Sequence, residues 1–238
     1  MGDTVALGDL VAEVVRKKIK HVHLSVYPPE GRVRISAPTH MDLATIRLFA
    51  ISKLGWIRSQ QHKVQAQERE LAREYLDRES HYVWGKRYLL RLDEADAAPQ
   101  VELKHAALVL TLRPGSDAQR RHGVLEAWYR EQVRAAVPAL FLKWEPLLTV
   151  RSRRVLVQRM KTQWGSCNPA TGNIRLNTDL AKKPPQCLEY IVVHELAHLI
   201  EPSHNARFTA LLDMFLPHWQ QTRDELNRLP VRHEDWMY

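Results

Sequence analysis

Residues 193–204 read VHELAHLIEPSH, and no other segment of the chain carries as much chemical information. It contains His-Glu-x-x-His, with His194 and His198 four positions apart, and a third histidine, His204, six positions further on. Positions i and i+4 share one face of an α-helix, so His194 and His198 can bind one metal ion together. Glu195 lies beside that pair, where its carboxylate can take a proton from a water molecule on the metal.

The third metal ligand has to come from outside that helical face. A catalytic zinc site usually has three protein ligands and one open position for water, and His204 is the candidate for the third. Pro202 disfavours helical conformation at Glu201, so we expect the helix to end at Glu201 or before it. The chain can then turn back and bring His204 to the metal. The motif therefore predicts one zinc ion per chain, although other divalent ions can substitute for it.

Apolar residues surround the metal-binding motif, as a buried active-site helix requires. They are Leu188, Ile191, Val192, Leu196 and Leu199. The alternative interpretation is a solvated helix with incidental histidines, because the chain has 12 of them. The apolar flanks favour the metal site.

The composition is ordinary for a soluble globular protein, with 45% hydrophobic and 26% charged residues in 238 positions. The formal net charge of +8 favours acidic partners such as nucleic acid or nucleotides, but charge alone singles out none of them. The two cysteines, Cys167 and Cys187, are too few for a disulfide framework and fit a reducing compartment. We find no signal-peptide pattern and no run of about 18 apolar residues, so we expect a cytoplasmic protein without a membrane partner.

The N-terminal half, residues 1–115, is predicted to be β-rich with one long helix. Asp42 is the candidate N-cap of that helix, which we expect to continue past Gly55 to about residue 78. The half contains no catalytic constellation and no internal repeat, so we interpret it as a packing or partner-binding module. Alternating or aromatic-rich segments predict strands over residues 21–27, 32–36, 82–92 and 101–112.

The C-terminal half, residues 116–238, is expected to form the catalytic domain. A helix is predicted from the apolar spacing of residues 124–144, with a kink at Pro138. A strand that begins at Arg154 leads into a second hairpin, residues 162–177, directly before the metal helix. The metal helix is predicted to begin near Pro184 and Pro185, and a final helix over residues 205–229 to be interrupted at Pro217.

Three segments together resemble a known family: MKTQWGSC at residues 160–167, NIRLN at residues 173–177, and HELAH at residues 194–198 with His204. They are similar to the YgjP-like zinc metallopeptidases, which are related to the SprT-like proteins within the zincins. The similarity is strong between about residues 155 and 219. It implies an α+β fold in which a zincin-like catalytic domain, made of the metal helix and a hairpin or small sheet, follows the β-rich N-terminal region.

Carried over by position, the resemblance places the metal ligands on the three histidines and the general base on Glu195. This chain departs from the family at Gln163, where an arginine is common, and at Glu201-Pro202, which replaces a polar, histidine-bearing run. The metzincins share the histidine spacing, but they have glycine where Glu201 stands, which argues against membership of that group.

The hairpin before the metal helix is the predicted substrate-binding element, because an extended peptide can pair with the edge of a strand. We expect Trp164 to close the wall of the cleft and Gly165 to permit a tight turn. Arg175, Asn177 and Tyr190 are candidates for the hydrogen bond to the oxyanion. The candidate substrate-binding residues are thus Trp164, Gly165, Arg175 and Asn177.

Three functions can use such a site. The first is zinc-dependent hydrolysis of a peptide or protein. The second is release of pyrophosphate from UTP or another nucleoside triphosphate, against which the lack of a glycine-rich phosphate loop counts. The third is a non-catalytic module that binds nucleic acid and holds structural zinc, although structural zinc sites usually have four protein ligands, often cysteines.

Overall fold

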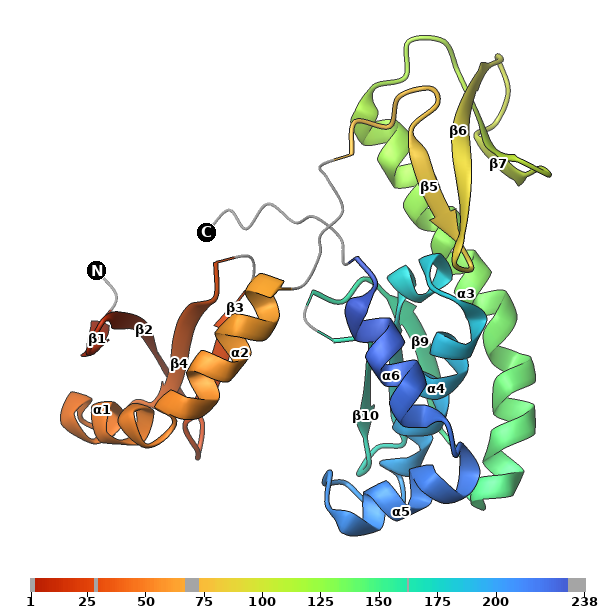
Figure 1. The fold of residues 1–238 in the computed structure, drawn as a ribbon. Coiled ribbons are helices and arrows are strands. Elements are labelled where there is room, and N and C mark those ends of the chain that lie inside the picture. The colour runs from red at the N-terminus through yellow and green to blue at the C-terminus, as the bar shows by residue number, and fades with distance from the viewer. Residues whose placement is uncertain (1–2, 28–29, 67–72, 162, 231–238) are drawn as a thin grey trace. The chain divides into compact units, whose positions relative to one another are not determined.

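The fold combines helices with several small sheets and is therefore α+β. A computed structural model describes residues 3–27, 30–66, 73–161 and 163–230 (Figure 1). Within these residues the chain forms eleven strands, six α-helices and one 3-10 helix. It divides into two compact units, residues 1–69 and 70–238, and each unit has its own hydrophobic core.

The first unit is a four-stranded sheet with two helices. The strand order is β1-β2-β4-β3, with antiparallel outer pairs and a parallel pair, β2 and β4, in the middle. The core side chains Ile35, Ile46 and Ile57 are completely buried, so both helices contribute to the same core. The elements are β1 (Asp3–Leu7), β2 (Leu10–Lys17), β3 (His23–Tyr27), β4 (Arg32–Pro38), α1 (Leu43–Ser52) and α2 (Leu54–Ala66).

The expected hairpin of β3 and β4 is confirmed, and so is the cap of the first helix. Asp42 accepts a hydrogen bond from the backbone N–H of Thr45 at 2.6 Å. The prediction of a single long helix is wrong: α1 ends at Ser52, the N–H of its C-cap Lys53 donates to the carbonyl of Ala50, and α2 begins at Leu54. The break allows apolar residues on both sides of it to reach one core. Residues 67–72 of the expected helix lie outside the described residues, and residues 73–78 are not helical.

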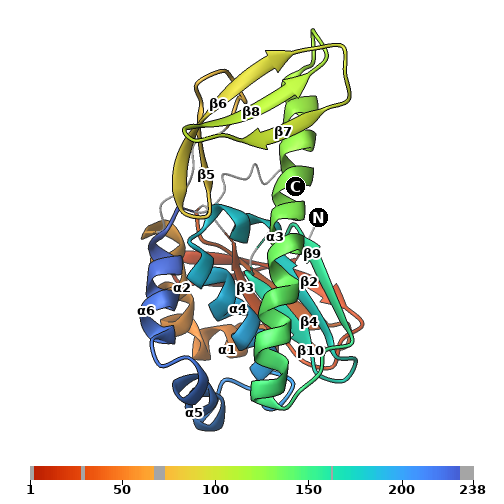
Figure 2. The same ribbon diagram turned by 90° about the vertical axis from the view of Figure 1, so that its right-hand side faces the viewer.

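The second unit contains two sheets joined by one long helix (Figure 2). The four-stranded sheet has the order β5-β6-β8-β7, and its pairs are antiparallel, parallel and antiparallel, as in the first unit. The repetition is one of strand order, which the sequence did not reveal. The strands are β5 (Ser80–Val83), β6 (Lys86–Glu94), β7 (Gln100–Leu103), β8 (Ala107–Leu112), β9 (Arg154–Gln158), β10 (Gly165–Asn168) and β11 (Asn173–Asn177).

Helix α3, Ala118–Leu148, holds these parts together. It packs on β7 and β8 near its start and on β9, η1 (Thr178–Lys182) and α4 (Pro185–Ala197) further along (Figure 2). It is longer than expected and continues through Pro138. Because β5 to β8 share a core with this helix, the division between units falls at residue 69, and the boundary expected at residue 115 lies inside the second unit.

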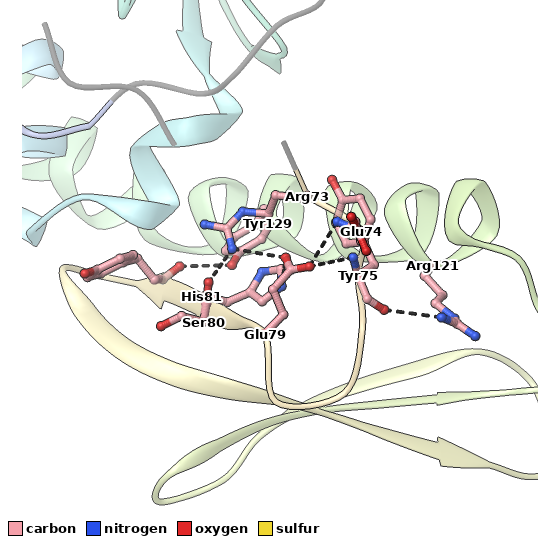
Figure 3. A network of polar contacts seen from close by, with 9 residues as sticks. Arg73, Glu74, Tyr75, Glu79, Ser80, His81, Arg121 and Tyr129 are labelled. Atoms are coloured by element: carbon pink, nitrogen blue, oxygen red, sulfur yellow. Dashed lines mark hydrogen bonds and ion pairs between the residues drawn. The ribbon is translucent and has the colours of Figure 1, made fainter. Parts of the chain in front are cut away.

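Polar contacts gather around Glu79 at the start of β5, and a further contact joins β5 to α3 (Figure 3). The Glu79 carboxylate lies 3.2 Å from the Arg73 guanidinium and 3.1 Å from Nε2 of the buried His81. From α3, the Tyr129 hydroxyl donates a hydrogen bond of 2.9 Å to the carbonyl of Tyr82. The Glu79 contacts hold residues 73–81 together, and the Tyr129 hydrogen bond joins β5 to the helix.

The turn between β5 and β6 touches the segment that leads into α4. The N–H of Trp84 donates to the carbonyl of Ala181 at 2.7 Å, and the N–H of Gly85 donates to Lys182 at 3.3 Å. Gly85 has a φ of +78°, and a Cβ there would lie 2.9 Å from Cγ of Pro184. Among the described helices, none is long and apolar enough to cross a membrane.

Candidate metal centre

Helix α4 carries the His-Glu-x-x-His motif through the middle of the second core. Nine of its thirteen residues are buried, and Glu195 is one of them. The helix ends at Ala197 with His198 as its C-cap, which confirms the expected end before Pro202. After this cap the chain makes a turn, in which the N–H of Glu201 donates a hydrogen bond of 2.9 Å to the carbonyl of Ala197.

The loop after α4 brings the third histidine back to the first two. It is followed by α5 (Ala206–Phe215), whose N-cap Asn205 accepts a hydrogen bond from the N–H of Phe208 at 3.0 Å. The candidate ligand atoms of His194, His198 and His204 all lie within 4.8 Å of one another. Nε2 of His194 and Nε2 of His204 are 3.0 Å apart.

This spacing fits a metal ion. Two nitrogens that bind one tetrahedral zinc ion at its usual bond length are roughly 3.3 Å apart. Burial and the two neighbouring imidazoles lower the pKa of His194 to about 3, and burial also lowers the pKa of His198. The neutral imidazole is the form that binds metal, so the protonation of the cluster suits the role. Imidazole nitrogens suit zinc and several other transition metals.

Contacts behind the imidazoles fix their orientation. Nδ1 of His198 lies 3.1 Å from the carbonyl oxygen of Glu201, the kind of contact that directs the other ring nitrogen of a ligand toward the metal. The ring of Phe208 contacts all three imidazoles, with centroid distances of 4.9, 4.6 and 4.8 Å to His194, His198 and His204. Phe208 was not among the residues predicted for the site, because the sequence places it only within the last predicted helix.

Glu195 and the three histidines line one cavity of about 430 Å³. Glu195 is 4% exposed, and burial raises the pKa of its carboxyl group to about 8 in the metal-free site. The remaining wall consists of residues 163–167 together with Pro169, Ile191 and Pro202. The cavity therefore combines a set of metal-binding nitrogens with one titratable carboxyl group.

Strand β10 forms one side of this cavity and is also an edge strand. The three-stranded sheet has the order β10-β11-β9, with β10 antiparallel and β9 parallel to β11. This confirms the predicted hairpin before the metal helix. An edge strand offers unpaired backbone groups to an extended chain.

The predicted substrate-binding residues separate into two groups. Trp164 and Gly165 line the cavity, whereas Arg175 and Asn177 do not. Arg175 is exposed on β11, and the buried Asn177 donates two hydrogen bonds of 2.8 Å, to the carbonyls of Met160 and Gln163. Asn177 therefore holds the approach to β10 in place.

Tyr190 and Gly165 also differ from expectation. Tyr190 is buried and is not among the cavity-lining residues; its ring lies edge-on to His194 at 5.7 Å and stacks on Trp219 at 6.3 Å. Gly165 was expected to permit a tight turn; it is the first residue of β10, with Trp164 in a bend before it, and has no positive φ.

These features define a class of protein. A buried helix with His-Glu-x-x-His, a third histidine brought back by a loop, and a carboxyl group in the same cavity are the parts of a metal-dependent hydrolase.

Comparison with known families also indicates a metal-dependent hydrolase and narrows the class to a metallopeptidase family. The profile described as YgjP-like, metallopeptidase domain, matches residues 20–229, and the chain belongs to this YgjP-like family. The resemblance seen in the sequence motifs is thereby confirmed, and it extends into the N-terminal unit as far as residue 20.

Two solved structures are similar in part. The metallopeptidase zymogen abylysin of Pyrococcus abyssi has 21% sequence identity and a TM-score of 0.36, covering 38% of this chain and 90% of its own. The metallopeptidase zymogen jannalysin of Methanocaldococcus jannaschii has 21% identity and a TM-score of 0.33, covering 40% of this chain and 92% of its own. No match was found among curated proteins.

Proposed function

We propose that the protein is a zinc-dependent peptidase with a zincin-like site, in which His194, His198 and His204 hold the metal and Glu195 is the general base. The observation that carries the proposal is the convergence of three imidazole groups in one cavity with a buried carboxyl group. Membership of a metallopeptidase family supports a peptide bond as the substrate.

The chemistry divides between the metal and the chain. When bound, a divalent ion supplies a Lewis acid that polarises the scissile carbonyl, acidifies water and favours the ionised form of a neighbouring carboxylate. The carboxylate of Glu195 accepts a proton as the water oxygen bonds to the carbonyl carbon. The same carboxyl group then donates that proton to the amine nitrogen as the carbon–nitrogen bond breaks.

The edge of β10 is the proposed binding place for the substrate backbone. Residues 165–168 pair with β11 on one side only among the described strands, and residues 163–167 line the cavity. A peptide that pairs there lies beside Glu195 and the histidines. Apolar walls at Trp164 and Ile191 suit uncharged side chains next to the scissile bond.

Two alternatives have less support. A triphosphate needs cationic or glycine-rich contacts to its phosphates, and the described residues that line the cavity include neither lysine nor arginine. A structural zinc site usually has four protein ligands, whereas three candidate ligands converge here among the residues that the structure describes. The net charge of +8 is the feature that favours nucleotides or nucleic acid.

The decisive variant is Glu195→Gln in the zinc-loaded protein, assayed against a peptide library and against UTP. We expect it to bind one zinc ion as the wild type does and to lose peptide turnover by roughly 10²–10⁴-fold, the usual contribution of a general base. The matched control is Glu189→Gln on the same helix. Glu189 lies outside the cavity lining and accepts hydrogen bonds from Lys143 and Trp144, which a glutamine oxygen can also accept.

Each outcome discriminates between the functions. Full peptidase activity of the Glu195 variant would contradict the assignment of the base. Pyrophosphate release from UTP without any peptide cleavage would favour the nucleotide reaction. Steeply salt-dependent binding of nucleic acid by a protein without either activity would favour the third function.

A further inference from the structure

Gly165 brings the backbone of β10 unusually close to the Glu195 side chain. A Cβ built on Gly165 would lie 2.6 Å from Oε1 and 2.8 Å from Cγ of Glu195, and 2.8 Å from Cγ2 of Ile191. Carbon atoms pack at about 3.5–4.0 Å, so all three approaches are too short for any side chain. The strand and the carboxyl group can be this close only because position 165 has no side chain.

Backbone conformation does not explain the glycine. Five other glycines among the described residues have positive φ, including Gly85 and Gly172, but Gly165 does not. It lies in register with Leu176 in a regular antiparallel pair, a conformation open to every residue type. The requirement for glycine at this position is therefore one of space beside Glu195.

Two side chains of α4 crowd position 165. Glu195 is 4% exposed, and Ile191, one turn earlier on the helix, is 6% exposed and lies against the same position. A methyl group at position 165 has to displace the carboxyl group or the strand by roughly 1 Å before normal contact distances are restored.

We propose that Gly165 is the positioning residue for Glu195: its missing side chain makes the space in which the carboxyl group lies beside the three histidines. The proposal rests on the proposed function for the role of Glu195 as base. Displacements of about 1 Å in an active site can cost roughly 100-fold in rate, so we expect Gly165→Ala to act mainly on kcat.

The first test uses the stability of the metal-free protein and needs no activity. Thermal unfolding is measured for the wild type, Gly165→Ala, Glu195→Ala and the double variant. Removing Oε1 and Cγ of Glu195 eliminates two of the three short contacts, so the fall in Tm caused by Gly165→Ala should be at most about half as large in the Glu195→Ala background. Equal falls in both backgrounds would overturn the proposal.

The second test uses the zinc-loaded enzyme. Gly165→Ala should lower kcat by at least tenfold, change KM less than threefold and bind zinc within threefold of the wild-type affinity. Gly123→Ala is the matched control, because Gly123 lies in α3 and a Cβ there would meet no atom within 4 Å. Its activity should equal that of the wild type.

The outcomes separate this proposal from the proposed function. An active wild type with an equally active Gly165→Ala overturns the positioning role alone. A raised KM at unchanged kcat also overturns the positioning role, because the substitution has then moved the substrate-binding edge of β10 and not Glu195. A zinc affinity lowered more than tenfold overturns it as well. A wild-type protein that cleaves no peptide overturns the proposed function. Glu195 then has no role as a general base, and the positioning role of Gly165 is overturned as well.

Discussion

Burial sets the chemistry of single side chains in this protein, and the two cysteines illustrate it. Cys187 in α4 is completely buried, and burial, followed by the charge of Glu225, raises the pKa of its thiol to about 12. Cys167 lines the metal cavity, where burial and then the charge of Glu195 raise the pKa of its thiol to about 11. Both thiols are free, as expected from the cysteine count.

Alkylation with iodoacetamide tests these environments. The thiolate is the reactive form, so a pKa of about 11 lowers the reactive fraction of Cys167 about 100-fold at pH 8 compared with an ordinary thiol. We expect Cys167 to react about 100-fold more slowly than a free thiol, about tenfold faster for each pH unit up to pH 10, and Cys187 to be slower still. The Cys187→Ser and Cys167→Ser variants separate the two rates, and a rate that levels off near pH 8.5 would contradict the expectation.

Single elements are placed by contacts between distant parts of the chain. The turn of β5 and β6 donates two backbone hydrogen bonds to η1, and Gly85 in this turn faces Pro184, the residue before α4. The position of the metal helix thus depends on a hairpin one hundred residues earlier in the sequence.

We therefore expect Gly85→Ala to destabilise the protein more than Gly115→Ala does, although both substitutions introduce similar backbone strain. Gly115 has a similar φ of +76°, but a Cβ there would meet no atom within 4 Å. We expect Gly115→Ala to lower the free energy of unfolding by about 1–2 kcal/mol through strain alone. Gly85→Ala adds the clash with Pro184 and should cost about 1–3 kcal/mol more. Urea unfolding measures both, and equal losses would show that Pro184 yields without cost.

Local patterns predicted elements well and their ends less well. The Asp42 cap, the hairpin at residues 165–177 and the break near Pro217, where α5 gives way to α6 (Trp219–Arg228), follow from short-range chemistry and are confirmed. The break at Lys53 could not be predicted, because it depends on which residues reach the shared core. The pair β1 and β2 was missed, although Gly8 with a φ of +77° makes the turn between them.

The candidate metal site was predictable in part, because some of its features also depend on short-range chemistry. The i, i+4 spacing of His194 and His198 and the helix end before Pro202 are properties of a short segment. The contact of Gly165 with Glu195 and the distance of Arg175 from the cavity arise from the packing of β10 on α4. The sequence contains no local signal for either.

At the level of the whole molecule, two cores divide the chain between the units. The first core consists of residues up to Ile57, with partly buried neighbours from the same unit, and the second begins at Val83 and includes the metal helix. We expected residues 1–115 to form one module. A list of predicted strands shows neither their order in a sheet nor which of them share a core, so the division at residue 69 could not be predicted. Metal binding should therefore stabilise the second core directly.

Calorimetry with and without a chelator tests this assignment. Zinc at roughly 1,000 times its dissociation constant adds about 4 kcal/mol to the stability of the state that binds it. For a unit of 150–250 residues this corresponds to a shift in Tm of roughly 8–16 °C. We expect EDTA to lower one unfolding transition by this amount and to leave a second one unchanged. Equal shifts in both transitions would contradict separate cores.

The repeated strand order has a consequence for how quickly the chain can fold. Each four-stranded sheet consists of two hairpins joined by a parallel pair, β2 with β4 or β6 with β8. A hairpin closes within about 1–10 μs, because its partners are neighbours in sequence. The parallel pairs join residues about twenty positions apart, such as Ala12 with Val33 and Leu89 with Ala107, and closing such loops costs more entropy. Docking of preformed hairpins, and not their formation, should therefore limit the rate at which each sheet assembles.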